Sequence, residues 1–399
     1  MKRLLSLICC AVLLLSLLPA PAAESAKAKN ITHKCKFTAT SGSINKVKDG
    51  NFKSYKKYWE SRSGSSTIKI AFPKGVTPGG IVVEWFVPFK EFEYRQYAAG
   101  PELLSAESSD GYFKGHVTYL AVDPSAIGVE LEVRQSGKIC KITVFSAGQE
   151  IEGFEKWNKN VPEKVDLLLI VAHQDDEELW FGGLLPYYGV VREKDVQVVF
   201  MTNCSRSRIK ESLNGLYVMG LRNVPEVAGF KNAYLSYSEC VDIWGGSDNI
   251  VRSLVRMIRM YKPDVLVTHD LNGEYGHPQH KVTARHMEEA VKAAKDPSRY
   301  PDSAELYGVW EVKKLYIHLS DTDPIYMDWN TPSEALGGKT PLQVATLGYK
   351  QHKSQQKAYS MEDGKKYDNT KFGLVYSAVG KDVNRNDLFE NIEPVPENY

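Results

Sequence analysis

The feature that most constrains this chain is an apolar run that ends at a cluster of ionisable side chains. Residues 167–172 are all apolar, and the polar residues that follow them are His173, Gln174, Asp175, Asp176, Glu177 and Glu178. A continuous apolar run of this length is typical of a strand that is covered on both faces, as in a parallel sheet. Open α/β sheets place their sites at the carboxyl ends of such strands. The junction at His173 therefore predicts a site at one edge of an α/β sheet.

The chain from about residue 160 to residue 399 alternates apolar strands with helical stripes. We expect strands at residues 165–172, 196–202, 265–268 and 315–319, an edge strand at 372–376, and helices at 209–219, 250–260 and 282–294. This alternation implies a Rossmann-like, largely parallel sheet with helices on both faces. No glycine-rich fingerprint follows these strands, so a dinucleotide-binding fold is disfavoured.

The preceding part, residues 30–150, has the period-two pattern of short antiparallel strands. We expect strands at residues 35–38, 66–72, 80–86, 129–133 and 142–145, separated by glycine and proline. The pattern predicts an all-β sandwich or jelly roll. A length of 399 residues also exceeds what one core usually supports, which agrees with two domains.

The first 23 residues have the order of a secretory signal peptide. Lys2 and Arg3 precede a mostly apolar run at 4–18, and small residues follow up to Ala22 and Ala23, where we expect cleavage. An uncleaved membrane anchor is the alternative. We expect the mature protein to be secreted or held in the cell envelope, without a transmembrane segment. The net charge of +1 gives no general attraction for nucleic acid or acidic membranes.

Four cysteines lie beyond the predicted signal peptide, an even number that permits two disulfides in an oxidising compartment. Their positions suggest the pairs Cys35–Cys140 and Cys204–Cys240. Free buried thiols are the alternative for each pair.

A second polar cluster follows the strand expected at residues 265–268. His277 and His280 lie three residues apart in a turn that begins with Gly273 and Gly276, so both imidazoles can converge on one ion together with the cluster at His173. A set of two histidines and one aspartate leaves a position for water, which is a hydrolytic zinc arrangement. Alternatively, the acidic residues only favour the start of a helix. His269 and Asp270 are reserve ligands at the same strand end.

At these positions the sequence resembles a known enzyme family. Residues 172–177, Ala-His-Gln-Asp-Asp-Glu, resemble the AHPDDE signature of the PIG-L/LmbE-type zinc N-deacetylases, and residues 276–280 are similar to the family's GHPDH motif. Arg208 and Glu211 match its R-x-x-E helix, and residues 352–355 resemble its H-x-S-Q element. The resemblance covers about residues 165–355, with the motifs in the family's order.

The resemblance implies a role for each matching residue. Its zinc ligands are His173, Asp176 and His280, its general base is Asp175, and a protonated His277 stabilises the oxyanion or protonates the leaving amine. Arg208 and His352 are candidate substrate contacts, although we expect an ion pair between Arg208 and Glu211 within their helix. Gln174 replaces the usual proline and Gln279 the usual aspartate. These departures predict a less rigid turn and a neutral neighbour beside the metal ligands.

Residues 45–51 and 58–61 resemble the opening of discoidin-like, galactose-binding-type domains, which implies a carbohydrate-binding β domain. Four aromatic residues are candidates for stacking on sugar rings or for the core: Trp59, Trp85, Tyr94 and Tyr97.

The sequence thus predicts an exported zinc-dependent N-deacetylase that hydrolyses the acetamide of an N-acetylated amino sugar or glycan to an amine and acetate. One alternative is an envelope glycan-binding protein whose α/β domain is a decayed, non-catalytic scaffold. Another is a metal-dependent hydrolase of a different amide or an ester. Metal analysis separates the scaffold from the two enzymes, because a scaffold has no reason to retain zinc.

Overall fold

The structure is a computed structural model that describes residues 26–48, 58–62, 64–100, 102–160, 162–356, 360–361 and 365–392. The predicted signal peptide at residues 1–23 lies outside the described residues, as does part of the 45–51 motif. Within the described ranges, no helix combines the length and the apolar character that a membrane span requires.

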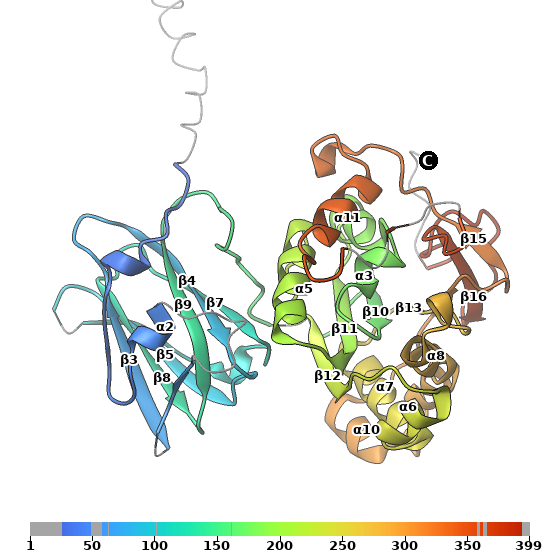
Figure 1. Ribbon diagram of the computed structural model, residues 1–399, viewed down its shortest axis with the longest axis horizontal. Helices are drawn as coiled ribbons and strands as arrows, with labels where there is room; N and C mark the ends of the chain where they lie inside the picture. The colour runs from blue at the N-terminus through green and yellow to red at the C-terminus, as the bar shows by residue number, and fades with distance from the viewer. Residues whose placement is uncertain are drawn as a thin grey trace, which may run out of the picture.

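The first part of the chain is a sandwich of two antiparallel sheets (Figure 1). One sheet has the order β1-β3-β8-β5-β6 and the other β2-β9-β4-β7. The strands are β1 Lys36–Ala39, β2 Trp59–Glu60, β3 Ser65–Ala71, β4 Pro78–Trp85, β5 Glu91–Tyr97, β6 Leu103–Ser108, β7 Val117–Ala121, β8 Gly128–Arg134 and β9 Lys138–Ser146. In β5 and β8 buried and part-exposed residues alternate, so each strand gives one face to the core and the other to solvent.

The aromatic residues considered for sugar stacking mostly belong to the core of this sandwich. Trp59, Trp85 and Tyr94 are buried among the apolar side chains between the sheets. The indole N–H of Trp85 donates to Thr118 Oγ1 at 2.9 Å, and the Tyr94 hydroxyl donates to the carbonyl of Ala121 at 3.1 Å. The polar groups of Trp85 and Tyr94 therefore have partners inside the domain, and all three residues belong to the core rather than to a sugar-binding surface.

The second part is a seven-stranded sheet in the order β12-β11-β10-β13-β14-β16-β15. The strands are β10 Leu167–Val171, β11 Val196–Asn203, β12 Glu226–Lys231, β13 Val265–Thr268, β14 Lys314–His318, β15 Pro324–Tyr326 and β16 Lys371–Ser377. The strands from β12 to β14 run parallel. The predicted edge position of β16 is wrong, because this strand lies antiparallel between β14 and β15.

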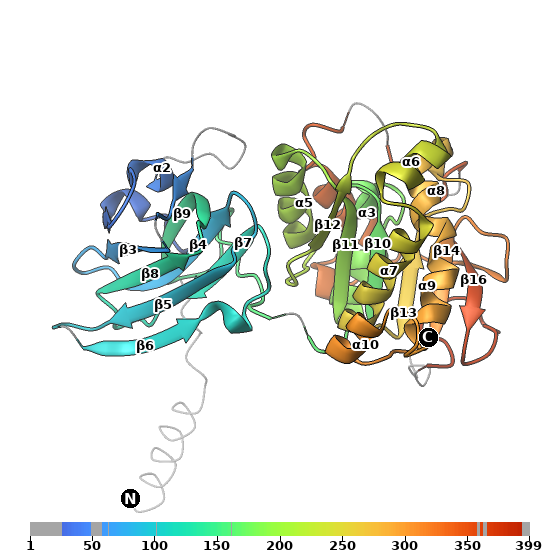
Figure 2. The same cartoon turned by 90° about the horizontal axis from the view of Figure 1, so that it is seen from below.

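Helices cover both faces of this sheet, as Figure 2 shows. One face packs on the apolar sides of α3 Asp176–Leu179, α4 Leu184–Pro186, α5 Arg206–Val218 and α11 Pro341–Tyr349. The other packs on α6 Tyr237–Ile243, α7 Ser247–Tyr261, α8 Pro278–Arg285 and α9 Met287–Ala294, with α10 Pro301–Tyr307 against α7. The helix expected at 282–294 is therefore two helices that meet at His286. The predicted fold class, a sandwich followed by a two-faced α/β sheet, is confirmed.

Neither predicted disulfide is present: Cys35, Cys140, Cys204 and Cys240 are free and buried. Cys35 lies in the core of the sandwich, whereas Cys140 points from the other face of β9 toward the α/β domain. Successive side chains of a strand face opposite sides of its sheet, so Ile139 takes the inward position and Cys140 the outward one. The thiols of Cys204 and Cys240 instead lie against Asn232 Nδ2 and the carbonyl of Ala233.

The two domains share a charged and apolar interface beside α5. Lys210 of α5 places its ammonium 2.9 Å from Glu84 Oε1 of β4 and 3.4 Å from Glu155 Oε1 of the connecting segment. Arg206, at the start of α5, lies over the ring of Phe86 and donates to the Phe86 carbonyl. Lys210 is half-buried, and the carboxylates of Glu84 and Glu155 balance its charge where the domains meet.

Candidate active site

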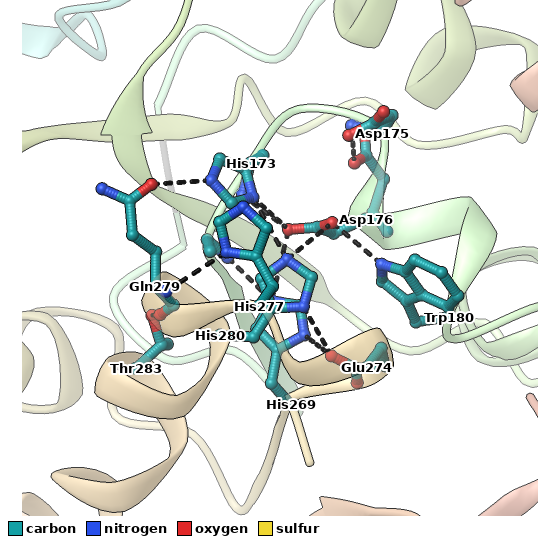
Figure 3. Close-up of polar contacts among 12 residues, drawn as sticks. His173, Asp175, Asp176, Trp180, His269, Glu274, His277, Gln279, His280 and Thr283 are labelled. Carbon is teal, nitrogen blue, oxygen red and sulfur yellow. Dashed lines mark hydrogen bonds and ion pairs between the residues drawn. The ribbon is translucent and has the colours of Figure 1, made fainter. Parts of the chain in front are cut away.

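Two neighbouring parallel strands bring the sequence motifs together. β10 and β13 are paired in register from Leu167↔Val265 to Ile170↔Thr268, so the residues after both strands lie at the same edge of the sheet. His173 precedes α3, Asp176 is the first residue of α3, and His280 lies in the first turn of α8. Figure 3 shows these side chains converging beside the His277 ring.

The three predicted metal ligands present a compact set of donor atoms. His173 Nδ1 lies 3.2 Å from His280 Nε2 and 3.2 Å from Asp176 Oδ2, and His280 Nε2 lies 3.3 Å from Asp176 Oδ1. Donor atoms on a tetrahedral zinc ion with bonds of about 2.0–2.1 Å are separated by about 3.3 Å. These three residues therefore fit a divalent metal of this size.

Hydrogen bonds to the far side of each ligand orient its donor atom. His280 Nδ1 donates to Glu274 Oε2 at 2.7 Å, and His173 Nε2 donates to Gln279 Oε1 at 2.9 Å. With those nitrogens protonated, His280 Nε2 and His173 Nδ1 keep their lone pairs for a metal. Burial alone raises the pKa of Asp176, but His280, His173 and His269 together hold it well below its usual range, so the carboxylate stays ionised.

Glu274 joins the histidines of this region and was not identified from the sequence. Its Oε2 also accepts from His269 Nδ1 at 2.8 Å, and its Oε1 accepts from His318 Nδ1 at 2.7 Å. Burial opposes the charge, yet the neighbouring His269 and the hydrogen bonds hold the pKa of Glu274 well below its usual range. Its place in the same turn, three residues before His277, was the available signal.

The reserve ligands His269 and Asp270 take supporting positions. The backbone N–H of Ala172 donates to His269 Nε2 at 2.9 Å, and His269 Nδ1 is held by Glu274. Both ring nitrogens of His269 are thus engaged, although Nε2 lies only 3.3 Å from Asp176 Oδ2. Asp270 donates its backbone N–H to Glu274 Oε1 at 3.2 Å. Both residues therefore support the turn around Glu274.

Asp175 occupies a backbone conformation that few non-glycine residues adopt, with φ of 127°. Its N–H donates to Glu177 Oε2 at 2.7 Å, which supports this conformation. Its carboxylate pairs with Arg208, whose Nη2 also donates to the Gln174 carbonyl at 2.7 Å. Burial raises the pKa of Asp175 to about 6, although Arg208 opposes that rise.

The expected pair of Arg208 with Glu211 is wrong, because Arg208 reaches across to Asp175 and Gln174. Glu211 Oε2 instead accepts the Ser354 hydroxyl at 2.5 Å, which joins α5 to the H-x-S-Q segment. The side-chain amide of Gln174 donates to the Thr202 carbonyl at 3.1 Å. The turn that lacks the usual proline is therefore held by the side chain and the carbonyl of Gln174.

His277 caps α8 and faces the ligand cluster. Its Nδ1 accepts the Gln279 N–H at 3.2 Å, which leaves the ring proton on Nε2. Its ring centroid lies 4.5 Å from that of His280 and 4.6 Å from that of His173. Burial, with the nearby His280 and His173, lowers the pKa of His277 to about 2. The ring is therefore neutral in the substrate-free site, and the protonated form implied by the resemblance stays a prediction for the reaction.

His352 has no exposed surface, so the structure gives no support for its predicted contact with substrate. Its Nε2 lies 3.3 Å from Glu178 Oε2 and 3.7 Å from Glu177 Oε1. A Cβ atom at Gly215 would lie 2.5 Å from Glu178 Oε1, so this glycine makes room for the carboxylate. Burial and the adjacent charge raise the pKa of Glu177 well above its usual range. The H-x-S-Q histidine thus belongs to a buried polar cluster behind Asp175.

Comparisons with known proteins agree with the sequence motifs. Residues 168–291 match the family described as PIG-L: GlcNAc-PI de-N-acetylase. A 1D-myo-inositol 2-acetamido-2-deoxy-alpha-D-glucopyranoside deacetylase of Geodermatophilus obscurus is 30% identical over 179 residues, which are 38% of this chain and 60% of that protein. A second such deacetylase, from Streptomyces scabiei, is 41% identical over 178 residues, 38% of this chain and 54% of that protein.

Among solved structures, N,N'-diacetylchitobiose deacetylase from Pyrococcus horikoshii matches 48% of this chain and 71% of its own length, with 16% identity and a TM-score of 0.37. The chain spans little more than half the length of the deacetylases it matches in sequence. The matched region holds both strand ends and every residue of the ligand set. Residues 168–291 are a PIG-L domain, of the family described as GlcNAc-PI de-N-acetylase.

Proposed function

We propose that this protein is an exported, zinc-dependent N-deacetylase that hydrolyses the acetamide of an N-acetylated amino sugar to an amine and acetate. One observation carries the proposal: His173, Asp176 and His280 present donor atoms 3.2–3.3 Å apart within a PIG-L domain. The relatives named above act on a 2-acetamido sugar, which supports the same substrate class here.

Zinc suits this donor set, because two imidazoles and one carboxylate are its usual ligands at hydrolytic sites. When bound, the ion supplies Lewis acidity, which lowers the pKa of water to about 7 and polarises a carbonyl. The buried hydrogen bonds from His280 to Glu274 and from His173 to Gln279 hold the ligands in the necessary tautomers. Because Gln279 is neutral, His173 donates its electron pair to a metal less strongly than it would beside a carboxylate.

Asp175 is the general base of the proposed reaction. A carboxylate whose pKa is raised to about 6 is ionised at neutral pH yet basic enough to accept a proton from the attacking water. The water oxygen bonds to the amide carbon, Asp175 passes the proton to the amide nitrogen, and the C–N bond then breaks to release the amine and acetate. The ion pair with Arg208 and the bond from Asp175 N–H to Glu177 hold the carboxylate in place. Arg208 is a positioning residue in this scheme.

His277 stabilises the negative charge that develops on the carbonyl oxygen. Its Nδ1 is engaged by the Gln279 N–H, so Nε2 carries the proton and can donate to that oxygen. A neutral imidazole performs this role without a change of protonation state. The role differs from amine protonation, which Asp175 provides.

Export rests on the N-terminal sequence, with its basic start, apolar run and small-residue exit. Cell fractionation and the mass of the mature N-terminus test it. Retention of residues 1–23 in the mature protein would contradict export by signal-peptide cleavage.

Zinc content and acetate release test the proposed activity together. Purified protein is assayed on N-acetylglucosamine, chitin oligomers and peptidoglycan fragments. We expect His280→Ala to lose the zinc, and Asp175→Ala to keep the zinc but lose turnover. Release of acetate by Asp175→Ala at the wild-type rate would contradict the mechanism, and no release from any sugar by the zinc-loaded wild type would contradict the activity.

A further inference from the structure

Tyr234 lies exposed beside the proposed catalytic histidine. Its side chain belongs to the loop that follows β12, and its ring centroid lies 5.0 Å from that of His277 at an interplanar angle of 85°. Tyr234 is 71% exposed, although His277 itself is buried. An aromatic ring that contacts a catalytic group and leaves most of its surface in water offers an apolar face to a bound substrate.

The backbone around Tyr234 is anchored on both sides. The Lys231 carbonyl accepts from Gln279 Nε2 at 2.8 Å and from Trp244 Nε1 at 3.0 Å. After the tyrosine, Ser236 caps α6 in a capping box with Glu239. Tight anchors on each side lower the entropy lost when a ligand packs on the ring. Gln279 also links this loop directly to the ligand His173.

We propose that Tyr234 is a stacking platform for the pyranose ring of the sugar that carries the reacting acetamide. This inference rests on the proposed deacetylase activity. In a 2-acetamido sugar the amide carbon is two bonds from the ring, so a carbonyl held at His277 places the sugar ring within a few ångströms. Tyr234, in contact with His277, lies within that distance. The C–H groups of a pyranose face pack on an aromatic ring, whereas an acyclic amide has no such face.

The platform therefore favours cyclic N-acetylated sugars over acyclic N-acetylated amines that share the same reacting group. Tyr234→Ala removes the platform, and Tyr234→Phe keeps the ring without its hydroxyl. An exposed tyrosine on β15, Tyr326, is 57% exposed and supplies a matched control as Tyr326→Ala.

The test uses N,N'-diacetylchitobiose, called chitobiose in this section. It measures zinc content, KM and kcat for chitobiose and for N-acetylethanolamine, and chitobiose binding by titration calorimetry. We expect Tyr234→Ala to raise the KM and the dissociation constant for chitobiose by roughly five- to tenfold. The kcat, the zinc content and the kcat/KM for N-acetylethanolamine stay at wild-type values. Tyr234→Phe and Tyr326→Ala match the wild type on both substrates.

Two results would overturn the platform: equal loss on both substrates in Tyr234→Ala, or unchanged binding of chitobiose. If the wild type binds chitobiose through Tyr234 but releases no acetate, the platform stands and the deacetylase activity fails. If acetate is released with the same KM in Tyr234→Ala and the wild type, the activity stands and the platform fails. A wild type that does not bind chitobiose and releases acetate from none of the N-acetylated sugars contradicts both.

Discussion

Replacing Glu274 with glutamine removes one charge from the centre of the site at almost constant side-chain volume. The carboxylate accepts hydrogen bonds from His280, His269 and His318 at 2.7–2.8 Å and has no exposed surface. A glutamine offers one acceptor oxygen and turns an amide N–H toward at least one of these rings. If that ring is His280, its proton moves from Nδ1 to Nε2, which occupies the lone pair intended for zinc.

The size of the effect follows from these contacts. Loss of a hydrogen bond that orients a metal ligand weakens metal affinity by about 10–100-fold, which corresponds to about 1.4–2.7 kcal/mol. Hydrogen bonds to a buried charge contribute about 1.5–3 kcal/mol each. With at least one of them lost, we expect the free energy of unfolding of the metal-free protein to fall by about 2–4 kcal/mol.

Competition with a chromophoric chelator measures the zinc dissociation constant of Glu274→Gln, and urea unfolding of the metal-free protein measures its stability. Glu334→Gln, at an exposed position, is the matched control and keeps wild-type values. A folded Glu274→Gln protein whose zinc affinity lies within threefold of the wild type would refute a need for the Glu274 charge in zinc binding.

Burial lowers the pKa of His116 to about 4, so the folded protein resists protonation that the unfolded chain accepts below about pH 6.5. As far as His116 determines it, the free energy of unfolding is therefore highest at neutral pH and falls as the pH drops from about 6.5 to 4. Urea unfolding should show the advantage of wild type over His116→Gln shrinking by about 3 kcal/mol between pH 7 and pH 4, and a pH-independent difference would contradict this. Lys210→Met leaves Glu84 and Glu155 without their shared cation, and we expect it to lower the free energy of unfolding by about 3 kcal/mol; an unchanged urea midpoint would refute a structural role for the bridge. Four buried thiols, rather than two disulfides, predict that denatured, unreduced mature protein reacts with four equivalents of a thiol reagent. Absence of reaction would indicate that both disulfides are present.

The site was largely predictable because its residues follow two apolar strands. The run at residues 167–171 is buried along its whole length, as a strand covered on both faces requires. Parallel pairing with β13 then brings His173 close to His280, although more than a hundred residues separate them. This step needs only the rule that parallel strands end at the same edge of the sheet and place functional sites there.

Contacts that cross between elements were harder to predict. Arg208 has a carboxylate one helical turn away at Glu211, but the start of α5 lies beside the strained turn at Asp175 and the arginine pairs there. Glu274 lies just before the motif at residues 276–280, and its role depends on three histidines from separate positions in the fold. Sequence spacing predicts contacts between neighbours along one helix, but not contacts between residues of different elements.

The missed strands have a different cause. β5 alternates part-exposed and buried residues, so its pattern was present but its outward Glu93 and Arg95 make it look like a polar loop. β12 contains Gly229 and has no buried residue, so only its pairing with β11 identifies it. The disulfides were wrong because cysteine count carries no information about which face of a strand each thiol occupies.

The most direct test of the proposed function is acetate release from N,N'-diacetylchitobiose by zinc-loaded wild type and zinc-loaded Asp175→Asn. The wild type should release one acetate for each amine formed. The variant, with equal zinc, should be slower by at least about a hundredfold, because general base catalysis contributes about 10²–10⁴-fold. Equal rates in the two proteins would contradict a deacetylase in which Asp175 accepts the proton of water. Absence of acetate release by the wild type from this and the other N-acetylated sugars would contradict the activity itself.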